Sequence, residues 1–221
     1  MSEGRRGATR EDLAELQNLL ERHARLFGDF TLASGIKSRY YFNGKRVTLS
    51  PAGATLVGRV LEPIVSRLGA EAVGGLQIGA IPLAMAVSLE SHRSGTAIPA
   101  FIVRVEMKEH GTKEEIAASY PPDESEEDSE LGHVQLMRPG RAVVVVDDVV
   151  TTGESIAKAI RAVEEAGCEV RAAIGLVTRP ERREDQDFLH GYKYISIFDC
   201  DLDGNLSLNP EAERLLSAAV A

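Results

Sequence analysis

The residues with the clearest chemical potential lie in segment 143–155, which reads VVVVDDVVTTGES. Four consecutive valines predict a buried strand, and the strand leads into two adjacent carboxylates, Asp147 and Asp148. A turn rich in threonine, glycine and serine follows and opens a helix. Backbone N–H groups, hydroxyl groups and the positive end of the helix dipole therefore meet in one small volume, which suits a phosphate group.

The two carboxylates beside this volume indicate what else the ligand contains. They repel a phosphate, but they are good acceptors for neighbouring sugar hydroxyls, either directly or through a hydrated cation. A ribose 5-phosphate satisfies both halves of the segment. Two other interpretations stay open on these residues alone, a Mg²⁺ site in a phosphoacceptor pocket and a polar strand end with a simple helix cap. The sequence has neither a GK[ST] signature here nor a GxGxxG after a strand, which disfavours triphosphate and dinucleotide sites.

Two further segments are candidates for the same site. Residues 74–80 (GGLQIGA) form a strand-to-helix turn whose small residues let the backbone approach a ligand, although such glycines equally serve structural turns. Residues 104–113 (RVEMKEHGTK) carry cations at three positions and a glycine hinge, as a lid over a polyanionic leaving group requires. A basic loop that is only solvated is the competing interpretation.

The first part of the chain predicts two helices around a region of short strands. An amphipathic helix is expected over 10–26, and short strands and turns over 30–49. A second helix begins at Ser50 with proline in its first turn and ends at Gly69. Pro63 is expected to kink it.

Strands and helices then alternate, which places the candidate segments on one sheet. The expected strands are 72–76, 100–105, 142–146, 170–177 and 194–198, and the expected helices are 81–90, 155–166 and one starting at 209. Continuous apolar runs such as VVVV and AFIV are typical of strands buried on both faces, as in a parallel sheet under crossover helices. The fold class is therefore α/β, with ligands at the carboxyl ends of the strands.

Composition excludes several classes of protein. The chain has 221 residues, 43% hydrophobic and 27% charged, as expected for one globular domain with an appendage. A formal net charge of −9 disfavours a general nucleic-acid binder, and six acidic side chains lie in the tract 123–130. The first residues do not resemble a signal peptide, no apolar run reaches the roughly 20 residues of a membrane helix, and the two cysteines lack CxxC spacing. A cytoplasmic protein with inert thiols is expected.

Together these segments resemble one family. Segment 143–155 is similar to the phosphoribosyl pyrophosphate signature of type I phosphoribosyltransferases. Residues 30–42 (FTLASGIKSRYYF) are similar to the hood that covers the site in the orotate branch, and residues 74–82 and 108–111 (KEHG) match that branch in place and order. The resemblance extends over roughly residues 10–200.

The resemblance implies a domain organisation and an activity. Residues 1–49 would form an N-terminal helix and hood, and residues 50–221 a phosphoribosyltransferase core with a lid at about 105–139. The implied enzyme is a pentosyltransferase that converts orotate and phosphoribosyl pyrophosphate into orotidine 5′-monophosphate and pyrophosphate, in pyrimidine biosynthesis. Its implied cofactor is Mg²⁺, held mainly by the substrate diphosphate, and its implied assembly is a homodimer.

The resemblance also assigns roles to individual residues. Asp147 and Asp148 would hold the ribose hydroxyls, and Thr151 through Ser155 would cradle the 5-phosphate. Arg104, Lys108 and His110 would meet the pyrophosphate, with the lid reaching into the partner's site of the dimer. The whole implied binding segment for phosphoribosyl pyrophosphate is Asp147, Asp148, Val149, Val150, Thr151, Thr152, Gly153, Glu154 and Ser155, and the implied catalytic residues are Arg104, Lys108, His110, Asp147 and Asp148.

The resemblance also implies which residues bind the base. Arg179, directly after the strand that ends at Val177–Thr178, matches the position that grips the orotate carboxylate, and its fork suits two carboxylate oxygens. Thr151, Tyr41 and Phe42 complete the implied orotate site.

The chain departs from the family pattern at several positions. Val105 stands where members usually have a lysine after the lid arginine, and Ala33 stands where many have a lysine before the Ser-Gly of the hood. Segment 74–82 has no lysine, and the acidic tract 123–130 replaces a shorter connection. These departures keep two alternatives open, a transferase for a purine or xanthine base and a non-catalytic sensor of phosphoribosyl pyrophosphate.

Overall fold

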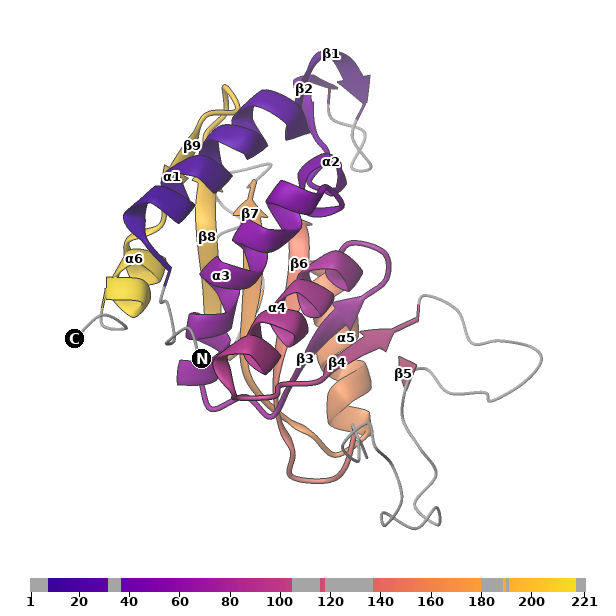
Figure 1. The fold of residues 1–221 in the computed structure, drawn as a ribbon. Helices are drawn as coiled ribbons and strands as arrows, with labels where there is room; N and C mark the ends of the chain where they lie inside the picture. Colours follow the sequence, from indigo (N-terminus) through magenta and orange to yellow (C-terminus); the bar gives the residue numbers. More distant parts are fainter. Residues whose placement is uncertain are drawn as a thin grey trace.

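The computed structural model describes residues 8–31, 37–104, 116–117, 137–179, 189 and 191–217 (Figure 1). The main sheet has seven strands in the order β5-β4-β3-β6-β7-β8-β9. Their bounds are β3 Ala72–Leu76, β4 Ala100–Val103, β5 Ile116–Ala117, β6 Ala142–Val150, β7 Glu169–Thr178, β8 Tyr194–Cys200 and β9 Leu206–Leu208. Strands β4, β3, β6, β7 and β8 run parallel, which confirms the expected α/β architecture.

The two edges of the sheet differ from the prediction. Strands β5 and β9 pair antiparallel with β4 and β8, so a parallel centre is bordered by antiparallel edges. Neither was expected, because two and three residues are too few to show a hydrophobic period. The predicted strand 142–146 was also too short. Strand β6 stays paired with β7 as far as Val150, so both aspartates lie inside the strand and not beyond its end.

Helices cover both faces of this sheet (Figure 1). Their bounds are α1 Arg10–Leu19, the π-helical turn η1 Leu20–Ala24, α2 Lys45–Thr48, α3 Pro51–Arg67, α4 Ala80–Ser94, α5 Glu154–Glu165 and α6 Pro210–Ser217. Side chains of α1, α3, α4 and α6 share one hydrophobic cluster, whereas those of α5 belong to a second. Within the described residues, no helix is both long and apolar enough to span a bilayer.

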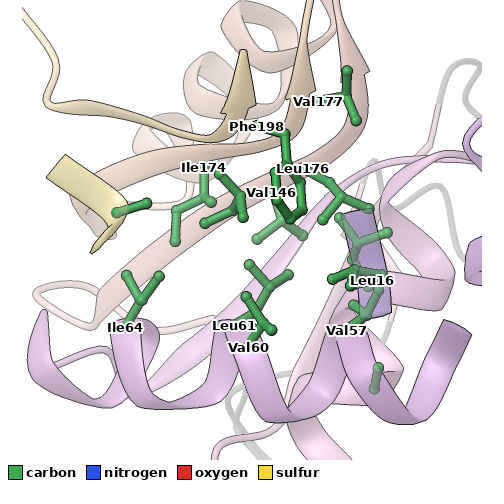
Figure 2. Close-up of a cluster of buried hydrophobic side chains, with 14 of the residues drawn as sticks. Leu16, Val57, Val60, Leu61, Ile64, Val146, Ile174, Leu176, Val177 and Phe198 are labelled. Atoms are coloured by element: carbon green, nitrogen blue, oxygen red, sulfur yellow. The ribbon is translucent and has the colours of Figure 1, made fainter. Parts of the chain in front are cut away.

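The valine run of β6 shows why the sheet needs both layers. Val144 and Val146 belong to the first cluster, where Val146 faces Leu61 and its neighbours on α3 (Figure 2). Val143 and Val145 belong to the second cluster, together with the α5 side chains. Successive side chains of a strand point to opposite faces, so a continuous apolar run is what a strand buried on both sides requires.

The second predicted helix matches its signals closely. The Ser50 hydroxyl accepts a hydrogen bond from the N–H of Gly53 and caps α3, and Pro51 occupies the first turn. The helix continues through Pro63 to Arg67. Gly69 follows with a φ of 67°, a left-handed conformation that favours glycine and ends the helix as expected.

The N-terminal segment required two corrections. The first helix was predicted to reach residue 26, but the chain enters strand β1, Arg25–Thr31, directly after η1. This strand pairs antiparallel with β2, Lys37–Phe42, and the two form a separate two-stranded sheet that we term the hood strands (Figure 1). The region 30–49 was expected to contain only strands and turns, yet it ends in the short helix α2. A helix of four residues is too short to show a hydrophobic period in the sequence.

Candidate active site

The candidate residues converge because parallel strands end at one edge. Val150 of β6 lies opposite Thr178 of β7, and the N–H of Arg179 donates to the carbonyl of Val150 at 2.7 Å. The N–H of Gln77 donates to the carbonyl of Val103 at 2.9 Å, directly before Arg104. The ends of β3, β4, β6 and β7 therefore meet, at the position where α/β sheets bind ligands.

Two carboxylates lie at the centre of this edge. Asp147 and Asp148 are only 9% and 4% exposed. The N–H of Asp148 donates to Oδ1 of Asp147 at 3.0 Å, which holds the first carboxylate in place. Burial, followed by repulsion from the neighbouring carboxylate, raises the pKa of Asp147 to about 7. Negative charge on this buried pair is therefore unfavourable, and hydrogen-bond donors of a ligand would stabilise it.

Two residues from other segments approach Asp148. Lys45 in α2 forms an ion pair with it, with 3.1 Å between Nζ and Oδ2. Gly79, the residue before α4, packs so closely that a Cβ there would collide with Oδ1 of both aspartates. The glycine-rich turn 74–80 thus brings backbone against the carboxylates, which explains why the last glycine in it is required.

The turn after β6 is the predicted anion-binding part of the site. Thr151, Thr152 and Gly153 connect β6 to α5, and Gly153 has a φ of 74° that favours glycine. Helix α5 then runs for 12 residues. Its first N–H groups have no carbonyl of the helix to bind, and they point toward the turn together with the positive end of the dipole. Val149 and Val150 are strand residues, and Glu154 and Ser155 form the first turn of the helix.

Arg179 connects this edge to the hood strands. The residue is 7% exposed. Its Nε donates to the Tyr40 hydroxyl at 3.0 Å, and its Nη2 donates to Ser38 Oγ at 2.7 Å. A guanidinium is thus held between β7 and β2, next to the strand that carries the aspartates.

The other two predicted base contacts lie differently on β2. Tyr41 is 41% exposed, and its ring lies 5.7 Å from that of Phe30. Phe42 points the opposite way and is buried in the first hydrophobic cluster. Tyr41 is accordingly open to a ligand, whereas Phe42 packs the hood strands onto the core.

Several predicted residues lie outside the described part of the chain. These are Lys108 and His110, the positions Ala33 and Val105, and the acidic tract 123–130. The described residues contain no group of three or more acidic, histidine or cysteine side chains that could hold a metal ion. Cys168 and Cys200 are both free and buried.

The comparisons with known proteins agree with this geometry. The family model "Phosphoribosyl transferase domain" matches residues 46–200. The chain is 39% identical over 184 residues to the orotate phosphoribosyltransferase of Nostoc sp., covering 83% of this chain and 81% of the other. It is 44% identical over 174 residues to that of Thermosynechococcus vestitus, covering 76% and 82%. The chain belongs to the orotate phosphoribosyltransferase family.

A solved structure extends the likeness to three dimensions. The orotate phosphoribosyltransferase of Mycobacterium tuberculosis in complex with Fe(III) dicitrate is 33% identical, with a TM-score of 0.65, covering 85% of this chain and 96% of that one. The same enzyme in complex with 5-phospho-α-D-ribosyl 1-diphosphate is 31% identical, with a TM-score of 0.61. These comparisons confirm the resemblance of the chain to this family.

The contacts of some residues in the candidate site could not be predicted from the sequence. Lys45 lies just before the residues matched by the family model and belongs to no motif. Its partner Asp148 is 103 positions away. Ser38 and Tyr40 lie within the hood segment that carried the resemblance, but no spacing related them to Arg179. Their alternation on β2, with Ser38 and Tyr40 on one face and Tyr41 on the other, was the available signal.

Proposed function

We propose that the protein transfers the ribose 5-phosphate group of phosphoribosyl pyrophosphate to orotate, giving orotidine 5′-monophosphate and pyrophosphate. The observation that carries the proposal is a buried arginine directly after β7, the strand next to the one that carries two buried carboxylates, in a chain 39% and 44% identical to named orotate phosphoribosyltransferases. An arginine suits the carboxylate of orotate, and the carboxylate pair suits a ribose.

The residues of β6 and the following turn would hold the donor. Asp147 and Asp148 accept hydrogen bonds from the two ribose hydroxyls, and the segment Thr151 to Ser155 surrounds the 5-phosphate with N–H groups and hydroxyls. Both ends of the sugar phosphate are thereby fixed. A nitrogen of orotate then attacks the anomeric carbon as the bond to pyrophosphate breaks, through an oxocarbenium-like transition state. Positioning supplies the catalysis, and no protein nucleophile takes part.

Cations would stabilise the departing pyrophosphate. Arg104 lies at the end of β4, and Lys108 and His110 follow it in the sequence as lid residues. Mg²⁺ bound to the diphosphate would neutralise part of its charge. Two adjacent carboxylates, one of them paired with Lys45, fit a metal carried by the substrate better than a protein-held one.

The family also supports a proposal for the assembly and the compartment. We infer a homodimer in which the lid of one protomer reaches the partner's site, and a cytoplasmic location in keeping with two free cysteines. Sedimentation velocity would test the first statement, and fractionation of the native host the second.

The decisive experiment is product identification. The protein is incubated with Mg²⁺, phosphoribosyl pyrophosphate and a mixture of orotate, adenine, guanine, hypoxanthine and xanthine. Formation of orotidine 5′-monophosphate alone is the expected result. The reaction is monitored through the loss of orotate absorbance. A purine nucleotide would instead assign another base, and a thermal shift with phosphoribosyl pyrophosphate but no product would assign a sensor.

A further inference from the structure

The hood strands hold Arg179 in a single orientation through two residues. Ser38 and Tyr40 are next-but-one neighbours on β2, so their side chains lie on the same face. The Tyr40 ring lies under the guanidinium, with 4.1 Å between Cζ and the ring centroid. Its hydroxyl accepts a hydrogen bond from Nε at 3.0 Å, and Ser38 Oγ accepts one from Nη2 at 2.7 Å. Three contacts thus fix both the position and the plane of the guanidinium.

The hydrogen-bond directions of these acceptors are also fixed. The single proton of the Tyr40 hydroxyl is donated to the carbonyl of Asp201 at 2.9 Å, so a lone pair faces Nε. The Ser38 hydroxyl donates to the carbonyl of Tyr40 at 2.7 Å, so its lone pair faces Nη2. Burial raises the pKa of Tyr40 to about 12, and the hydroxyl therefore keeps its proton under working conditions. Both groups are committed as acceptors for the guanidinium before any ligand binds.

We propose that Tyr40 and Ser38 are positioning residues that orient Arg179 for the carboxylate of the base. This inference rests on the proposed function. The guanidinium is held through Nε and Nη2, and it meets the substrate carboxylate through the Nη1 hydrogens. An unrestrained arginine loses rotamer freedom when it binds a ligand. In this protein Arg179 already loses that rotamer freedom on folding. Affinity for an anionic base therefore depends on Ser38 and Tyr40, which need not touch the base.

Single variants separate this role from a general structural one. Tyr40→Phe keeps the ring under the guanidinium but removes the acceptor for Nε, together with the hydrogen bond from the hydroxyl to the carbonyl of Asp201. It is expected to raise KM for orotate about tenfold, as for loss of one hydrogen bond to a charged group. Ser38→Ala, at a half-buried position, should raise it about threefold. Both variants should keep KM for phosphoribosyl pyrophosphate and kcat within about twofold of the parent, since those report on other groups.

The matched control is Tyr192→Phe. This variant likewise removes a tyrosine hydroxyl, here one that donates to Glu164 at 2.7 Å on the surface next to α5. It should leave all three kinetic constants unchanged. If the two Tyr→Phe variants raise KM for orotate equally, the proposal is overturned.

A double-mutant cycle shows whether Tyr40 acts through Arg179. In an Arg179→Lys background the forked donor is absent, so adding Tyr40→Phe should not raise KM for orotate further. A full tenfold effect in that background would contradict the proposal. Should Tyr40→Phe fail to fold, as judged by its unfolding transition, the same cycle with Ser38→Ala decides.

The same data distinguish failure of the inference from failure of the proposed function. If the parent protein neither binds orotate in calorimetry nor consumes it, the proposed function is wrong. If the parent does both and the hood variants match it, only the positioning role is wrong.

Discussion

The candidate site has two halves, the aspartate pair on β6 and Arg179 after β7, and the buried charges in them differ in how fully they are paired. On β6, two carboxylates stand side by side, and the described contacts include one lysine, with 38% of its side chain exposed. Directly after β7, one arginine has hydrogen bonds to two hood residues and an aromatic ring beneath it. The difference indicates that the proposed ribose half on β6 is destabilised until a ligand supplies donors, whereas the proposed base half is already satisfied and pre-oriented.

The largest expected effect of this difference is on stability. Because the folded pKa of Asp147 is raised from 3.8 to about 7, the folded state binds more protons than the unfolded state between those values. The stabilisation from this proton is complete below about pH 4 and is lost as the pH rises to about 7. Asp147→Asn removes the titration, so it should raise the free energy of unfolding at pH 8 by on the order of 4 kcal/mol. Urea unfolding at pH 4, 6 and 8, without substrate or metal, measures this gain.

Asp201→Asn provides a control of opposite sign. Hydrogen bonds, first of all from the side chain of Asn205, lower the pKa of Asp201. Its ionised form therefore stabilises the fold above the unfolded pKa, and that stabilisation is lost as the pH falls. This variant should be destabilised at pH 8 and approach the parent at low pH. If both variants change stability in the same direction at pH 8, the contrast between the two kinds of carboxylate is wrong.

The next effect is on activity in the ribose half. Asp148→Asn replaces a carboxylate acceptor by an amide, which weakens charge-assisted hydrogen bonds to a ribose hydroxyl. We expect kcat/KM for phosphoribosyl pyrophosphate to fall about 100-fold, as for loss of one to two such bonds. Asp203→Asn, at an exposed position in the β8–β9 connection, is the control. Activity within threefold of the parent would remove Asp148 from the ribose site.

Arg179→Ala should produce the complementary result in the base half. Loss of the guanidinium should weaken orotate binding about 30-fold and leave the affinity for phosphoribosyl pyrophosphate unchanged. The same change should lower the unfolding temperature, because it leaves Ser38 and Tyr40 without their buried partner. Calorimetric titration with each substrate tests the first statement. Equal losses for both substrates would show that the two halves are not independent.

The same contrast explains how much the sequence could predict. The proposed ribose half comes from one stretch, in which a valine run, two aspartates and a helix start follow each other, so periodicity and residue type were enough to predict its strand and its helix start. The base half joins Tyr40 to Arg179 across 139 positions. Such a contact depends on how the hood strands pack on the sheet, which local patterns do not contain. Only resemblance to the family located Arg179, and its two partners on β2 required the structure.

Lys45 shows the same limit at the level of a single charge. The sequence around it, NGKRV, contains no motif, and its partner Asp148 lies 103 positions away. Helix α2 packs against η1, α3 and α4, so its place next to strand β6 depends on how those helices are arranged. Gly44 also contacts Asp148, because a Cβ there would lie 2.9 Å from its Oδ2. The lysine is therefore placed by the fold and not by any local signal.

The smallest expected effect concerns this lysine. Its positive charge lowers the pKa of Asp147, whereas burial and the charge of Asp148 raise that pKa by a larger amount. Lys45→Met should therefore move the acidic limb of the pH profile of kcat/KM for phosphoribosyl pyrophosphate to higher pH, at a fixed excess of Mg²⁺. Because the lysine is partly solvated, the loss should be about threefold at pH 6 and smaller at pH 8.5. Lys45→Arg should restore the parent profile. A Met variant whose loss is the same at every pH would mean that Lys45 contributes to substrate binding directly and leaves the protonation of the carboxylate pair unchanged.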